Sequence, residues 1–175
     1  MEYVDVYTRD GKLVRASVSK HDARHAGDYC KHVLVILKTK DSPAPGMGEG
    51  QYVVQQRSLK AKYYAGKWDL TGGGVRASES EIVAACREVK EELGIKVLEK
   101  DMKPAFNYIQ DWSNGTGLFI SVFMCRVDVP NSGYDYDPYE VNDVKIMPFN
   151  EFYECVMDHN SQEFGDSLKK VENRL

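Results

Sequence analysis

Residues 73–95 read GGVRASESEIVAACREVKEELGI, and this stretch decides the fold. Its apolar residues recur at intervals of three and four, which is typical of a helix with one buried face. They are Ile82, Ala85, Cys86, Val89 and Leu93. Ser78 is followed three residues later by Glu81, and this spacing predicts a capping box at the start of the helix. Gly94 is expected to end the helix, because glycine adopts a left-handed backbone conformation without steric cost.

Three carboxylates share one face of this helix, because Glu88, Glu91 and Glu92 stand at positions i, i+3 and i+4. Like charges at this spacing repel each other by about 0.2–0.5 kcal/mol per pair on an exposed helix. A face that accumulates such repulsion suits a hard cation, and carboxylate oxygens are ligands that Mg²⁺ or Mn²⁺ prefer. The alternative is an ordinary solvated acidic face on which Arg87 and Lys90 are ion-pair partners.

The same stretch carries a longer pattern. It runs glycine, five residues, glutamate, seven residues, Arg-Glu, an aliphatic residue, any residue, Glu-Glu, any residue, glycine and an aliphatic residue. The chain matches every defined position from Gly73 to Ile95. This pattern is the Nudix box, and the chain resembles the Nudix hydrolase family. The resemblance implies an α/β class fold with a single Nudix domain over residues 1–175. In that α/β/α sandwich, a mixed β-sheet carries the box helix on one face and the C-terminal helices on the other.

The resemblance also assigns roles to residues of the box. Those expected to bind metal are Glu88, Glu91, Glu92 and the backbone carbonyl of Gly72. Those assigned to catalysis are Glu79, Arg87, Glu88 and Glu91. Glu88 and Glu92, one helical turn apart, are the principal ligands on the family model, and Glu91 is either a further ligand or the general base. Arg87 is expected to pair with Glu79 and so to orient the loop before the helix.

The reaction that the resemblance implies is hydrolysis within a diphosphate, X–O–P–O–P–O–Y, in which Y is often a nucleoside. Water attacks a diphosphate poorly because the phosphate oxygens are negative. Mg²⁺ or Mn²⁺ would neutralise that charge and lower the pKa of a bound water, and a carboxylate would accept the water's proton. The expected substrate is therefore a small-molecule diphosphate, whose identity the box does not specify.

The stretch before the box, QQRSLKAKYYAGKWDLTGGG, is similar to the branch of the family that contains isopentenyl-diphosphate isomerase. Its basic residues Arg57, Lys60 and Lys62 are candidates for binding phosphate oxygens, with a solvated turn as the alternative. The isomerase has a cysteine just after its tryptophan, whereas Asp69, Leu70 and Thr71 follow here. Hydrolysis is therefore the favoured chemistry. The alternatives are an isomerase-like enzyme and a catalytically silent nucleotide-binding regulator, although such regulators usually lose box carboxylates.

Composition excludes some classes of protein. The chain of 175 residues, 42% hydrophobic and 29% charged, suits one globular domain. Its net charge of -4 argues against nucleic acid as a partner. No apolar run is long enough to cross a membrane, and no signal peptide is expected. The scattered cysteines Cys30, Cys86, Cys125 and Cys155 suggest reduced thiols in a cytoplasmic protein. Homodimers are common in the family, but no sequence signal indicates one here.

The remaining elements follow from periodicity and turn residues. Strands are expected at residues 2–7, 13–18, 32–37, 52–56, 96–98, 106–112 and 115–129, and helices at 151–157 and 162–173. The acidic and aromatic loop at residues 131–139 is either a substrate lid or a plain packed loop. Glu140, just after it, is a candidate for a further metal ligand or base. His21 and His25 lie in a polar segment, where surface positions are favoured over ligand contact.

Overall fold

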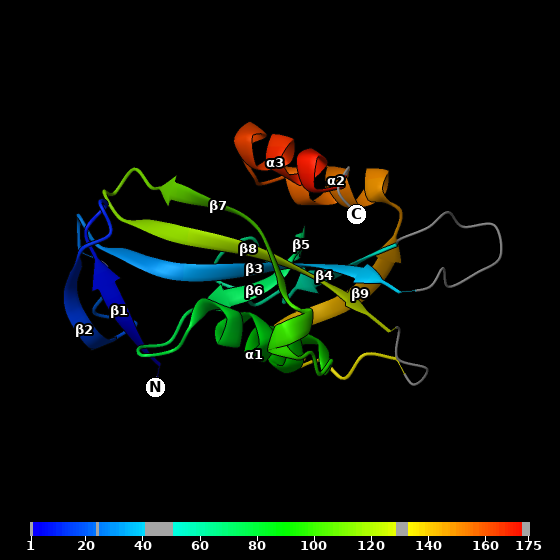
Figure 1. Cartoon of the computed structure of the whole chain (residues 1–175), viewed down its shortest axis with the longest axis horizontal. Helices are drawn as coiled ribbons and strands as arrows, with labels where there is room; N and C mark the ends of the chain where they lie inside the picture. The colour runs from blue at the N-terminus through cyan, green and yellow to red at the C-terminus, as the bar shows by residue number, and fades with distance from the viewer. Residues whose placement is uncertain (1, 24, 41–50, 129–132, 173–175) are drawn as a thin grey trace.

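The computed structural model describes residues 2–23, 25–40, 51–128 and 133–172. In these residues nine strands form one sheet, flanked by helices (Figure 1). The strands are β1 (Tyr3–Tyr7), β2 (Leu13–Ser19), β3 (Tyr29–Thr39), β4 (Tyr52–Arg57), β5 (Trp68–Asp69), β6 (Thr71–Gly74), β7 (Lys103–Asp111), β8 (Gly117–Val127) and β9 (Val141–Met147). The helices are α1 (Glu81–Leu93), the 3₁₀ turn η1 (Glu99–Asp101), α2 (Phe149–Met157) and α3 (Gln162–Glu172).

Strand β3 lies at the centre of the sheet, as its apolar run predicts. It runs parallel to β8 along its whole length and antiparallel to β1, β4 and β6. Strand β4 continues the sheet to β5 and β9, and β7 pairs with the outer edge of β8, all antiparallel. The sheet is therefore mixed, and its central strand is buried on both faces.

Alternation along β3 builds the two layers of the core. Val33, Val35 and Leu37 pack on the face that carries α1. Leu34 and Ile36 point to the opposite face, where α2 and α3 lie. Figure 1 shows α1 on one side of the sheet and α2 with α3 on the other. The predicted α/β/α sandwich is confirmed.

Helix α1 begins two residues later than the predicted capping box requires. Its N-cap is Ser80, whose hydroxyl accepts the backbone N–H of Val83 at 3.3 Å. Ser78 instead adopts a left-handed conformation, with φ of 65°, in the turn before the helix. The carboxylate of Glu81 forms an ion pair with Lys31 at 2.9 Å. The box of Ser78 and Glu81 was therefore wrong, because both residues are engaged by the turn and by the sheet.

The segment after α1 confirms one prediction and contradicts another. Gly94 ends the helix in a left-handed conformation, with φ of 70°, as predicted. Residues 96–98, expected as a strand, have no regular structure and lead into η1. Ile95 and Val97 pack against the core beneath α1, so their alternation reflects burial of side chains without strand pairing.

Two further findings concern the chain as a whole. No helix in the part of the chain that the structure describes is long and apolar enough to cross a lipid bilayer. All the cysteines, which fall within the described ranges, are free thiols. Most of the loop expected at residues 131–139 is described from residue 133 onward, and the first part of it lies outside the described residues.

Candidate active site

The glycines of β6 let the box helix approach the sheet closely. A Cβ at Gly73 would overlap the carboxylate of Glu88, and a Cβ at Gly72 would overlap the backbone carbonyl of Val33. Neither neighbour can shift freely, because one belongs to the backbone of β3 and the other is a buried side chain of α1. Gly73 is thus required for Glu88 to lie directly against β6, and Gly72 for the close pairing of β6 with β3.

Glu92 is bound from the sheet side. Only 6% of the residue is exposed. Its Oε2 accepts a hydrogen bond from the Gln55 side-chain amide at 2.7 Å and from the Gly72 backbone N–H at 2.9 Å. The N–H and C=O of one residue in an antiparallel strand point to the same edge. The Gly72 carbonyl is therefore directed toward the same side of β6 as Glu92.

Arg87 connects the carboxylates to the loop before the helix. Its Nε and Nη2 each donate to the Glu79 carboxylate at 2.9 Å, and Nη2 also donates to the Gly74 carbonyl at 2.9 Å. Its Nη1 donates to Glu88 at 2.6 Å and to Glu91 at 3.0 Å. This bidentate pairing with Glu79 fixes the loop relative to the helix, because a planar guanidinium allows only one such orientation.

The same surroundings set opposite pKa shifts on neighbouring glutamates. Burial raises the pKa of Glu88 above its usual value, although the charge of Arg87 opposes this. Burial raises the pKa of Glu92 well above its usual value, the charges of Glu88 and Glu140 add to the rise, and its two hydrogen-bond donors only partly offset it. For Glu79, burial is the largest single effect and raises the pKa, but the hydrogen bonds from the Arg87 side chain and the Arg76 backbone, together with the charges of both arginines, outweigh it, so the pKa is lowered. Glu88 and Glu92 thus form a buried, mutually repelling pair.

Glu91 is more exposed than that pair. Its side chain is 43% exposed, and its carboxylate pairs with Arg76 at 3.3 Å and with Arg87 at 3.0 Å. Within the described ranges, no three carboxylate, imidazole or thiol groups converge closely enough to enclose a metal ion in this conformation. The convergent set is Glu88 with Glu92, and the charge of Glu140 raises the pKa of both.

Of the basic residues before the box, Arg57 ends β4, and Lys60 and Lys62 lie on the loop between β4 and β5. Arg57 donates to the backbone carbonyl of Tyr63 at 3.2 Å. The Lys62 ammonium lies 5.1 Å from the centre of the Tyr63 ring, and the Lys60 ammonium lies 5.8 Å from that of Tyr139. All three side chains are thus directed at aromatic residues or backbone in the described structure.

Gln55 is the site residue that sequence reasoning missed. It lies on β4, and the register of the sheet directs its side chain beneath α1, where it meets Glu92. Nothing in the sequence around Gln55 and Gln56 indicates that either side chain contacts a carboxylate of the box. Only the pairing of β4 with β5 and β9 determines which of Gln55 and Gln56 faces the helix.

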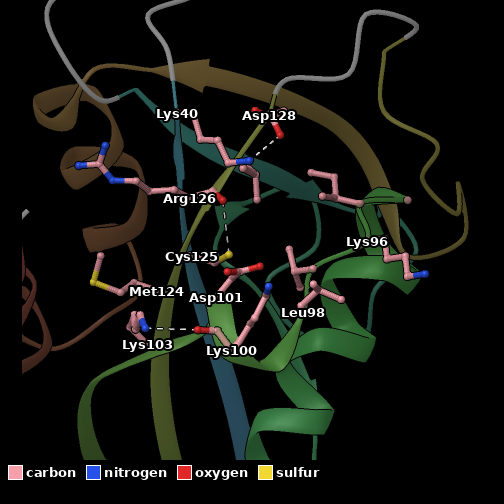
Figure 2. Close-up of a pocket in the computed structure, with 14 residues that line it drawn as sticks. Lys40, Lys96, Leu98, Lys100, Asp101, Lys103, Met124, Cys125, Arg126 and Asp128 are labelled. Carbon is pink, nitrogen blue, oxygen red and sulfur yellow. Dashed lines mark hydrogen bonds and ion pairs between the residues drawn. The ribbon is translucent and has the colours of Figure 1, made fainter.

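A cavity of about 820 Å³ lies beyond the C-terminus of α1 (Figure 2). Its described lining comes from the segment after α1, from η1 and from the ends of β3 and β8, and includes no residue of the carboxylate cluster. Lys40 and Asp128 form an ion pair at its rim, at 2.6 Å. Burial raises the pKa of the Cys125 thiol to about 11, so this thiol is protonated and inert at neutral pH.

Comparisons with known proteins agree with this geometry. The family model described as the NUDIX domain matches residues 33–167. Nudix hydrolase 3 of Arabidopsis thaliana is 26% identical over 161 residues, which cover 86% of this chain and 20% of that protein. An uncharacterised Nudix hydrolase of Pseudomonas aeruginosa is 38% identical over 84 residues, covering 46% of this chain and 47% of that protein. The chain thus spans about a fifth and about half of the lengths of these relatives.

Solved structures share the fold. A Deinococcus radiodurans protein superposes with a TM-score of 0.70 at 16% identity, covering 97% of this chain and 99% of that one. The NUDIX domain of Shewanella oneidensis NrtR, in complex with ADP ribose, superposes with a TM-score of 0.61 at 14% identity, covering 87% and 92%. With the family model matched from the central strand to the last helix and the box geometry in place, the chain belongs to the Nudix family.

Proposed function

We propose that this protein is a metal-dependent hydrolase that cleaves a diphosphate linkage in a nucleoside diphosphate joined to another moiety. The observation that carries the proposal is the buried pair of Glu88 and Glu92, held against the glycine strand β6 with no cation beside it except Arg87 among the described residues. Membership of the Nudix family, which includes proteins named as hydrolases, supports the same reaction class.

The donor set fits Mg²⁺ or Mn²⁺. Carboxylate and backbone carbonyl oxygens are the ligands that these hard cations take, and the set comprises Glu88, Glu92 and the Gly72 carbonyl, with Glu91 and Glu140 adjacent. Arg87 offsets only part of the cost of burying these two carboxylates, whose pKa values are raised, and a divalent ion would supply further positive charge. When bound, such an ion would neutralise diphosphate oxygens and acidify a water molecule.

The protein's own groups position the substrate and accept the proton. Glu91 is the most exposed carboxylate of the box helix, and we assign it the role of general base or additional ligand. Arg87 holds Glu79, Glu88 and Glu91 in one hydrogen-bonded network, so we assign it a positioning role. We assign Arg57, Lys60 and Lys62 the role of binding phosphate oxygens.

The substrate is proposed from chemistry and from likeness. The NrtR domain was solved with ADP ribose, a nucleoside diphosphate joined to a sugar, and it shares this fold. We propose that the substrate is a small molecule of that class. We propose neither nucleic acid nor a membrane as a partner. Free thiols suit a cytoplasmic protein. We also propose that residues 1–175 fold as one domain. A homodimer is possible, and analytical ultracentrifugation would measure whether two copies associate.

The rival isomerase reaction needs a thiol after the tryptophan. Here Asp69 follows Trp68, and its carboxylate lies 3.1 Å from the His159 imidazole. Cys86, the next cysteine along the chain, packs against the core beneath α1. These positions support hydrolysis over isomerisation.

The test is a panel of diphosphates, including ADP ribose, nucleotide sugars, dinucleotide polyphosphates and isopentenyl diphosphate. Each is incubated with the purified protein and either Mg²⁺, Mn²⁺ or EDTA. We expect cleavage of at least one nucleoside-containing compound with a metal ion and none in EDTA. Conversion of isopentenyl to dimethylallyl diphosphate would instead support the isomerase. Nucleotide binding without any turnover would support a silent regulator.

A further inference from the structure

An exposed aromatic ring lies in the turn that leads into β9. Tyr139 is 77% exposed, more than any other large hydrophobic side chain in the described ranges. It directly precedes Glu140, the residue that leads into β9. Single exposed apolar residues are common on protein surfaces and carry no meaning by themselves. The position of this ring relative to the site is what distinguishes it.

Strand β4 connects the ring to the carboxylates. Gln55 on β4 donates to Glu92, and two residues further along the same strand Arg57 pairs with Val141 of β9. Two residues of a strand span about 7 Å. Tyr139 therefore lies on the turn that borders the cluster, and the charge of Glu140 on the buried glutamates agrees with that placement.

The backbone of this turn is fixed. The carbonyl of Asp137 accepts the N–H groups of Glu140 at 3.0 Å and of Val141 at 2.8 Å. The Asp137 carboxylate accepts the N–H of Tyr139 at 2.9 Å. The carbonyl of Glu140 accepts the N–H of Ser58 at 2.9 Å, which ties the turn to the loop after β4. The ring is thus held on an ordered backbone, which lowers the entropy lost when a ligand stacks on it.

A cation accompanies the ring. The Lys60 ammonium lies 5.8 Å from the centre of the Tyr139 ring, and the Lys60 N–H donates to the Ser58 hydroxyl at 3.2 Å. The ammonium lies over one face of this exposed ring, and an aromatic face together with an ammonium matches a ligand that joins a planar base to a negative diphosphate. An aliphatic group such as a prenyl chain has neither a π-face nor a planar shape to match it.

We infer that Tyr139 is the stacking platform for the base of a nucleoside diphosphate substrate. This inference rests on the proposed function, because it assigns a specificity residue to the same site. Tyr139 sets affinity for the nucleoside half, while the carboxylate cluster acts on the diphosphate half. The ring touches substrate but takes no part in the bond cleavage.

The experiment compares two ligands that differ only in the nucleoside. α,β-Methylene-ADP and methylenediphosphonate share a P–C–P group that the reaction does not cleave. Dissociation constants are measured by calorimetry with Mg²⁺ for the wild type, Tyr139→Ala, Tyr139→Phe and Tyr139→Trp. The control is Trp112→Ala, which removes an exposed ring at the β7–β8 turn.

We expect Tyr139→Ala to weaken α,β-methylene-ADP by about 10-fold or more and to change methylenediphosphonate by less than about 2-fold. The Phe and Trp variants and Trp112→Ala should bind both ligands like the wild type. The inference is overturned if Tyr139→Ala leaves α,β-methylene-ADP unchanged, weakens both ligands equally, or if the wild type binds the two ligands equally. Because binding is measured without turnover, a protein that stacks the nucleoside but hydrolyses nothing would refute the proposed function alone.

Discussion

Glutamates of one short stretch behave differently because their neighbours differ. Glu79 lies against the guanidinium of Arg87, which keeps its pKa low. Glu92 is buried against β6 beside another carboxylate, and its pKa is raised well above the usual value. The sequence identifies both residues as candidates, since the box spacing is complete. The sequence does not show that the pKa values of Glu79 and Glu92 differ. Each pKa depends on burial and on neighbouring charges, and only the fold brings Arg87 to Glu79.

The raised pKa predicts how stability depends on pH. Without metal, the unfolded state ionises Glu92 near pH 4.5 and the folded state does so only at higher pH. The carboxyl therefore favours folding fully below pH 4.5, and this contribution is lost as pH rises through the folded pKa. Glu92→Gln keeps the oxygen that accepts from Gln55 and Gly72. In EDTA at neutral pH we expect the variant to unfold at a higher temperature, by about 2–4 °C for each kcal/mol gained.

Thermal unfolding from pH 4 to pH 8 checks this, with Glu151→Gln on an exposed turn of α2 as control. The wild type should lose stability more steeply than Glu92→Gln as the pH rises, while the control should follow the wild type. Mg²⁺ should then stabilise the wild type and not Glu92→Gln, because a ligand raises stability only where it binds the folded state. Equal slopes in EDTA would contradict the burial of an ionisable carboxyl at this position.

Gly73 supplies a second prediction at this scale. A methyl group at Gly73 would overlap the Glu88 carboxylate, whereas a methyl at Gly74 meets nothing within 4 Å. We expect Gly73→Ala to destabilise the protein by about 1–3 kcal/mol and to lower hydrolysis by displacing Glu88. Gly74→Ala, the matched control, should retain both properties. Chemical denaturation and a hydrolysis assay measure the two effects, and equal behaviour of the variants would show that Glu88 does not need this close approach.

The box helix shows what periodicity predicts about an element and where it fails. The apolar spacing correctly places α1 and its buried face, and Gly94 ends it as expected. The start of the helix was predicted two residues early, since Ser78 and Ser80 are both good caps by residue type. Tertiary contacts decided between them, because Glu81, needed for the earlier box, pairs with Lys31 on β3. The strand predicted at residues 96–98 was also wrong, because the alternating apolar residues there are packed against the core without pairing to another strand.

The two serines give a test at the scale of the helix. Ser80→Ala removes the hydroxyl that accepts the Val83 N–H, and we expect it to cost about 0.5–2 kcal/mol of stability. Ser78→Ala should cost less than about 0.5 kcal/mol, since no hydrogen bond of its hydroxyl is found among the described residues. Urea denaturation of both variants distinguishes them. A larger loss for Ser78→Ala would mean that the helix begins earlier than described.

For the whole molecule, the hydrophobic patterns agree with the architecture, but the resemblance to the Nudix family was needed to predict it, and neither predicts the register. The continuous run in β3 predicts a central strand, and the resemblance predicts helices on both faces of the sheet, as observed. The contact of Gln55 with Glu92 depends on how β4 pairs with its neighbours, and the approach of Glu140 depends on where β9 begins. Such long-range pairings have no local signature, so the contact of Gln55 with Glu92 could not be predicted from the sequence.

We propose above all that Glu92 belongs to a metal-dependent centre for diphosphate hydrolysis. The direct measurement is the turnover rate of Glu92→Gln beside the wild type, with the substrate that the panel identifies and with saturating Mg²⁺. Circular dichroism confirms that the variant is folded. We predict a loss of about 10²-fold or more. A folded Glu92→Gln variant that hydrolyses the substrate at the wild-type rate would contradict the claim.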